Sequence, residues 1–143
     1  MVSRAAAMVV LASAAMVFEI AETTVARAQE QKETYVAKLD ADGVQRARLI
    51  GGEYFFRPAR IVVKVNVPVE LLASKEAGIV PHNLVIQAPE AGIAVEEELG
   101  SEPKKIRFTA TAPGKYPFYC SNRLLFFASH RERGMEGVLE VVP

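Results

Sequence analysis

The sequence predicts an all-β protein, a sandwich of seven to eight short strands. Three observations support this fold class. Apolar and polar residues alternate in several short segments, turn residues separate these segments, and no long segment has the 3.6-residue period of an amphipathic helix.

The clearest alternation lies in residues 61–67. Ile61, Val63, Val65 and Val67 share one parity, which predicts a strand with one face on the core. Before this strand, residues 29–38 are mostly polar and predict a loose arm or an edge strand. The turn residues 42–43 are followed by a predicted strand at 44–50. After residues 61–67, Pro68 indicates an edge position, a bulge or the start of a new strand.

The remaining predicted strands cover residues 83–87, 105–110, 115–120 and 137–142. A turn at Pro113-Gly114 introduces the third of these strands. Residues 88–103 contain prolines, glycines and glutamates and are expected to form a loop, in which residues 93–99 fit a helical turn.

The first 28 residues predict a cleaved export signal. Arg4 precedes an apolar stretch at residues 5–18, and Ala26-Arg27-Ala28 is a small-x-small cleavage site. We expect cleavage before Gln29 and a periplasmic or secreted protein. The alternative is an uncleaved anchor, although a membrane span needs about 20 apolar residues and this stretch is shorter.

The mature chain is predicted to consist of an N-terminal arm or edge strand, residues 29–43, and one domain, residues 44–143. The whole chain carries 17 basic and 17 acidic residues, a formal net charge of zero. Nucleic acid is therefore not expected as a partner, because its recognition depends on a basic surface.

The chain contains one cysteine, Cys120, and two histidines, His82 and His130. An exported protein with one cysteine cannot form an intramolecular disulfide, so this thiol needs burial or a ligand role. With Met135, these residues provide the thiolate, two imidazoles and thioether of a mononuclear type 1 copper site. The downstream residues are spaced Cys-x9-His-x4-Met.

Each of these residues also has a purely structural interpretation. Cys120 could be an inert buried residue, His82 could belong to a turn, His130 could lie on a charged surface, and Met135 could be core packing. The order of the four, each next to a predicted strand boundary, favours a metal site. The thioether favours copper over zinc.

Four segments together resemble the cupredoxins, in particular the plastocyanin and azurin branch. The segments are Phe-Arg-Pro-Ala-Arg-Ile at 56–61, Pro-His-Asn-Leu-Val-Ile at 81–86, Pro-Gly-Lys-Tyr-Pro-Phe-Tyr-Cys at 113–120 and His-Arg-Glu-Arg-Gly-Met-Glu-Gly at 130–137. The resemblance extends over about residues 44–142 and implies a Greek-key sandwich that binds one copper ion.

The resemblance also assigns roles to residues. It implies that His82, Cys120 and His130 are the equatorial copper ligands and that Met135 is the weak axial ligand. It further implies that Asn83 ties the two ligand loops together by hydrogen bonds.

One segment departs from the family pattern. Nine residues, 121–129, separate the cysteine from the second histidine, more than plastocyanin-like and azurin-like loops contain. We call residues 121–129 the insertion loop. We expect it to fold back over the metal and bury Leu125 and Phe127; the alternative is an exposed apolar patch where a redox partner docks.

The function expected from these residues is outer-sphere electron transfer by a monomeric copper protein with a redox partner protein, without enzymatic activity. The alternative is a copper-handling protein that binds Cu(I) for delivery or storage. A binuclear copper centre is excluded because its two bridging thiolates need two cysteines, and the chain has one.

Overall fold

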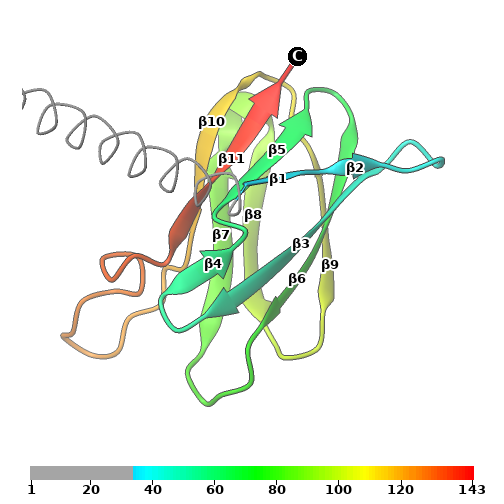
Figure 1. Ribbon diagram of the computed structural model, residues 1–143. Helices are drawn as coiled ribbons and strands as arrows, with labels where there is room; N and C mark the ends of the chain where they lie inside the picture. The colour runs from blue at the N-terminus through cyan, green and yellow to red at the C-terminus, as the bar shows by residue number, and fades with distance from the viewer. Residues whose placement is uncertain (1–33) are drawn as a thin grey trace, which may run out of the picture. The chain divides into compact units, whose positions relative to one another are not determined.

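The computed structural model describes residues 34–143, and the predicted export signal lies outside these residues. The described residues form eleven strands and one 3-10 helix. The strands are labelled in Figure 1. The elements are β1 (Thr34–Val36), β2 (Lys38–Leu39), β3 (Gln45–Gly52), β4 (Phe55–Arg57), β5 (Arg60–Lys64), β6 (Pro68–Lys75), β7 (His82–Ala88), η1 (Pro89–Ala91), β8 (Ile93–Leu99), β9 (Lys104–Thr109), β10 (Gly114–Tyr119) and β11 (Glu136–Val142).

The strands form two sheets that pack face to face, which confirms the predicted all-β sandwich. One sheet has the order β1-β5-β11-β10-β7-β8. The other has the order β2-β3-β6-β9, with β4 paired to β3. Within residues 34–143, no helix is long and apolar enough to cross a membrane.

The core lies between the sheets and follows the period-two pattern of the sequence. On β5, Ile61 and Val63 are buried, whereas Val62 is half-buried and Lys64 is exposed. Gln45 on β3 adds a polar tie between the sheets, because its amide donates to the backbone oxygen of Lys64 and accepts from the Lys64 N–H. The sandwich is therefore fixed by apolar packing and by a buried side-chain bridge.

Strand β8 corrects the expected loop with a helical turn. Ile93, Val95 and Leu99 are buried and alternate with exposed Glu96 and Glu98, which is the period of a strand. The whole segment pairs antiparallel with β7. Glutamate is intrinsically disfavoured in strands. Here the carboxylates point outward from an edge strand and stay in contact with water.

The strand order brings separate parts of the sequence to one end of the sandwich. β7 lies between β10 and β8, and β10 also pairs with β11. The beginning of β7, the end of β10 and the beginning of β11 therefore meet. His82, Cys120 and Met135 lie at these three boundaries.

Candidate metal centre

The four candidate copper ligands come from one inner strand and one loop. His82 is the first residue of β7, and Cys120, His130 and Met135 lie between β10 and β11. All four side chains are buried: Cys120 and Met135 are 0% exposed, His82 is 5% and His130 is 6% exposed.

The structure brings the two imidazoles and the thiol together. His82 Nδ1 and His130 Nδ1 are 3.1 Å apart, and Cys120 Sγ lies 3.4 Å from His130 Nδ1 and 3.9 Å from His82 Nδ1. The potential ligand atoms of the three residues all lie within 4.8 Å of one another. One soft thiolate and two imidazoles at this separation fit a copper ion.

Met135 is tied to the same site through its backbone. Its carbonyl accepts from the Cys120 N–H at 3.1 Å, and its own N–H donates to the His130 carbonyl at 2.9 Å. A thioether from this position adds the third donor type of a type 1 site, so the four residues fit one type 1-like copper ion.

The long spacing between Cys120 and His130 does not separate them in space. The His130 N–H donates to the Asn122 carbonyl at 2.9 Å, which closes the insertion loop at its base. A tight turn follows, in which the Ser129 N–H donates to Glu132 Oε2 at 2.6 Å and the Glu132 N–H donates to Ser129 Oγ at 3.2 Å. This reciprocal cap orients the chain so that His130 points to the site.

The insertion loop itself corrects the expected burial. Leu125 is 75% exposed and Phe127 is 48% exposed, so they do not form a buried lid. Phe126 is also exposed, and its ring stacks on that of Phe127 with centroids 5.0 Å apart. The loop between β10 and β11 projects away from the sandwich (Figure 1), so its tip has no core to enter. The structure matches the alternative, an exposed apolar patch.

Asn83 joins the two parts of the chain that carry the candidate ligands. Its side chain donates to Ser121 Oγ and accepts from the Ser121 N–H, both at 2.8 Å. Its backbone N–H points to Cys120 Sγ at 3.4 Å. These contacts fix the position of the sulfur relative to β7.

Tyr54 and Gly51 contribute to the site but carry no ligand pattern in the sequence. The Tyr54 ring packs edge-on against His130 with centroids 5.3 Å apart, and the Arg133 guanidinium donates to the Tyr54 hydroxyl at 3.2 Å. Gly51 gives room to Met135, because a Cβ at position 51 would lie 3.0 Å from Met135 Cε. Such contacts depend on how β3 packs on the ligand loop, which periodicity alone does not reveal.

Burial controls the protonation of the metal-free site. It lowers the pKa of His82, with the neighbouring His130 and Lys75 acting in the same direction. It also lowers the pKa of His130, with help from Arg133, and it raises the pKa of the Cys120 thiol. The apo site therefore holds neutral imidazoles and a protonated thiol at neutral pH, and metal binding has to displace the thiol proton.

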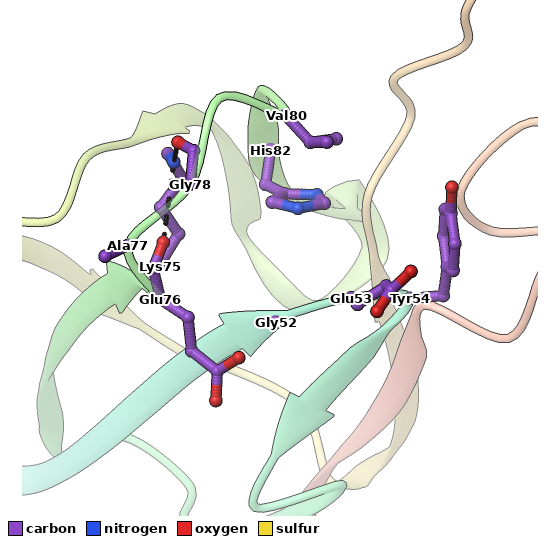
Figure 2. Close-up of a pocket in the computed structure, with 9 residues that line it drawn as sticks. All are labelled: Gly52, Glu53, Tyr54, Lys75, Glu76, Ala77, Gly78, Val80 and His82. Carbon is purple, nitrogen blue, oxygen red and sulfur yellow. Dashed lines mark hydrogen bonds between the residues drawn. The ribbon is translucent and has the colours of Figure 1, made fainter.

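Two cavities flank the site. One, of about 250 Å³, borders His82; Figure 2 shows Lys75, Glu76 and Gly78 on one side of it and Glu53 and Tyr54 on the other. The second is an open groove of about 600 Å³ between the β6–β7 loop and the insertion loop. Its lining includes Ile79, Val80, Leu124, Phe127 and His130.

Comparisons with known proteins relate the domain to copper proteins of known structure. No family model and no curated protein matches the sequence. Solved structures do match: the metal-binding domain of the Streptococcus pneumoniae Cu(I)-exporting P-type ATPase CopA with Cu(I) is 25% identical, with a TM-score of 0.58, covering 78% of this chain and 98% of that chain.

Two further structures share the fold at lower identity. A copper-binding protein in its apo form is 20% identical, with a TM-score of 0.56, covering 75% of this chain and 95% of that chain. Auracyanin B is 19% identical, with a TM-score of 0.55, covering 75% of this chain and 94% of that chain.

Proposed function

The described domain has the cupredoxin fold and the residue types of a type 1 copper site, and from this premise we propose that the protein carries electrons with one copper ion. The proposed ligands are His82, Cys120, His130 and Met135. Copper supplies the Cu(I)/Cu(II) couple, and the chain supplies ligands that both oxidation states accept. The protein acts as a carrier, with no substrate and no enzymatic activity.

One observation carries this proposal. Three buried donor atoms from two distant parts of the chain lie within 4.8 Å of one another. Hydrogen bonds from Asn83 and from the backbone of Met135 hold these parts together. Ligands that are fixed in advance leave little to rearrange when an electron arrives or leaves, which favours electron transfer.

The exposed apolar residues support a protein as the redox partner. The groove beside His130 is bordered by two loops whose leucine, isoleucine, valine and phenylalanine side chains lie in water. A contiguous apolar surface next to a metal ligand suits transient contact with a partner protein. The protein would work as a monomer that meets this partner through the groove.

The proposed location is the periplasm or the extracellular space. It rests on the sequence of residues 1–28, which has the three parts of a cleaved export signal. The intact mass of the protein recovered from the periplasmic fraction tests it: a mature chain that begins at Gln29 is expected, and a full-length chain retained in the membrane fraction would contradict it.

The visible spectrum of the Cu(II)-loaded protein tests the copper site. An intense thiolate-to-copper band is expected in the wild type, and Cys120→Ser should abolish it. His130→Gln should weaken copper binding, whereas Met135→Leu should keep the band and change the reduction potential, because the axial ligand is weak. Lys115→Gln, on the exposed side of β10, is the control. A wild-type protein that binds copper without this band would contradict the proposal.

A second candidate function is delivery or storage of Cu(I). One observation favours it: the similar domain of the Streptococcus pneumoniae exporter holds Cu(I), at 25% identity to this chain. Cyclic voltammetry separates the two functions. Reversible oxidation and reduction of the bound ion is expected for a carrier, whereas a delivery protein should transfer Cu(I) to a competing acceptor protein and cycle poorly.

A further inference from the structure

The outer face of the five-stranded sheet gathers basic side chains that take no part in the candidate copper centre. We call this surface the basic face. It is formed by Arg46 and Arg48 on β3, Arg57 on β4, and Lys105 and Arg107 on β9. The strand register places these residues in adjacent rows, because Arg48 lies opposite Leu72 on β6, and Leu72 lies opposite Lys105.

One row of the basic face is compensated by a buried carboxylate. Glu70, 5% exposed, pairs with Arg107 at 2.7 Å and with Arg46 at 3.2 Å. The hydrogen bond from Arg107 is the largest of the influences that hold the pKa of Glu70 below its usual range. Arg46 also pairs with Asp40 and Asp42. These charges are used to hold strands together.

The other basic side chains have at most one acidic neighbour, at a longer distance. Arg48 and Arg57 have no acidic partner among residues 34–143; Arg57 lies over the Phe55 ring, 4.3 Å from its centroid. Lys105 approaches Glu70 only to 4.0 Å, and 63% of its side chain is exposed. Three cations on this surface are therefore available to an external anion.

These three cations border a hollow. The hollow has a volume of about 420 Å³ and is lined by four basic residues and one acidic residue, which leaves a formal charge of four minus one, or +3. Leu72, Ile50, Tyr35 and Pro58 supply apolar parts of the lining. The basic face therefore offers positive charge around a partly apolar depression.

We propose that the basic face binds an acidic segment of a partner protein, whose carboxylates pair with Arg48, Arg57 and Lys105. Guanidinium groups match carboxylates with two parallel hydrogen bonds, and a hollow with apolar lining accepts the side chains next to those carboxylates. An anionic membrane surface is the weaker match, because membrane binding also needs exposed apolar side chains. Within residues 34–143, Ile50 is the only large apolar residue of this face that is exposed.

The basic face and the candidate copper centre lie on opposite sides of strand β3. Ile50 lies on the outer side of β3, and the next residue, Gly51, faces Met135 on the inner side. A partner bound here would approach the site from the β3 side, behind Met135. Binding itself needs no copper, so the proposal stands or falls independently of the electron-transfer function.

The test is a titration of the isotope-labelled, metal-free protein with poly-L-glutamate, followed by NMR. We expect amide shift changes on β3, β4 and β9 and an affinity that falls with added salt. Arg48→Gln/Arg57→Gln should weaken binding about tenfold or more. Lys64→Gln/Lys115→Gln removes the same charge from exposed positions of the other sheet and should weaken it by less than about threefold.

Three outcomes would overturn the proposal. One is an equal loss of affinity in both double variants, which would mean that net charge alone attracts the polymer. Another is the lack of shift changes on the basic face of the wild type, a measurement that does not depend on how the variants fold. The third is binding to phosphatidylglycerol vesicles without binding to poly-L-glutamate, which would assign the face to a membrane surface.

Discussion

Gly51 illustrates, at the scale of a residue, how a position without a side chain shapes the candidate copper centre. A Cβ at this position would lie 3.0 Å from Met135 Cε, 3.4 Å from Phe56 Cε1 and 3.5 Å from Leu99 Cδ1. The methyl group of a thioether can move by a few tenths of an ångström, whereas the ring and the leucine are held in the core. Strain at Gly51 is therefore transmitted to the proposed axial ligand.

We expect Gly51→Ala to lower the free energy of unfolding by about 1 kcal/mol, because it overpacks a buried site. In the Cu(II)-loaded protein it should also shift the reduction potential, since Met135 has to move. Denaturant unfolding of the apo protein and voltammetry of the copper form measure the two effects. Gly100→Ala is the control, because its nearest neighbour would be 3.8 Å away. Equal behaviour of the two variants would contradict the role of Gly51.

The second prediction at this scale concerns Asn83. Asn83→Ala removes both side-chain hydrogen bonds to Ser121 and should destabilise the apo protein by about 1–3 kcal/mol. Ser121→Ala keeps the hydrogen bond from its own backbone N–H to Asn83 Oδ1, so it should lower the free energy of unfolding by less than Asn83→Ala does. Chemical denaturation measures the free energy of unfolding of both variants. The reverse ranking would mean that Asn83 is not the main link between β7 and the ligand loop.

At the scale of elements, the sequence predicts strands well where one face of the strand is buried and the other is exposed to solvent. β5 and β9 have this pattern, and both were expected from alternation. β8 was missed because its glutamates and its preceding proline and glycine have the composition of a loop. Its pairing with β7 is a tertiary contact, and such contacts override local preference.

The insertion loop provides the prediction at the scale of an element. Leu125→Ser/Phe126→Ser should leave the free energy of unfolding within about 0.5 kcal/mol of the wild type, because both side chains lie in water. Phe118→Ala, in the core, should lower it by about 3–5 kcal/mol and calibrates the assay. Thermal unfolding of the apo proteins measures both. A large loss of stability in the double variant would mean that the loop packs against the sandwich in solution.

At the scale of the whole molecule, the chain alone indicates which residue types could form the copper site, but not that they meet. The order His, Cys, His and Met is informative because His82, Cys120 and Met135 lie next to strand boundaries, whereas His130 lies inside the loop between β10 and β11. The separations between their atoms depend on β7 and β10 pairing, on the turn after His130 and on the base of the insertion loop. The pairing of β7 with β10 is a long-range contact, and the loop geometry depends on specific hydrogen bonds; apolar periodicity reveals neither.

The stability of the whole apo molecule should depend on pH through the two histidines. Burial lowers the pKa of both below the unfolded value of about 6.5, so the unfolded chain binds protons that the folded chain does not. The contribution of the histidines is fully present above about pH 6.5 and is lost as the pH falls through the folded pKa values. Thermal unfolding from pH 7.5 to about 5 should therefore show a falling midpoint.

The variant His82→Gln/His130→Gln provides the control for this pH dependence, and its midpoint should change little over the same range. The carboxylates of Asp42, Glu70 and Glu132, whose pKa values are lowered in the fold, interfere little, because their contribution to stability falls only as the pH approaches the unfolded values of about 4. A midpoint that falls equally in the wild type and the double variant would assign the effect to other groups.

The hydrogen bond between the His130 N–H and the Asn122 carbonyl has a consequence for how such a protein can diversify. This hydrogen bond brings the two ends of residues 123–129, which make up most of the insertion loop, close together. These residues could therefore be replaced as one segment. We expect segments of other lengths and compositions to fit between the same junction residues without changing the separation of the sulfur and the imidazole. Under the proposed function, exchange of residues 123–129 would change the surface offered to a partner protein and leave the four proposed ligands unchanged.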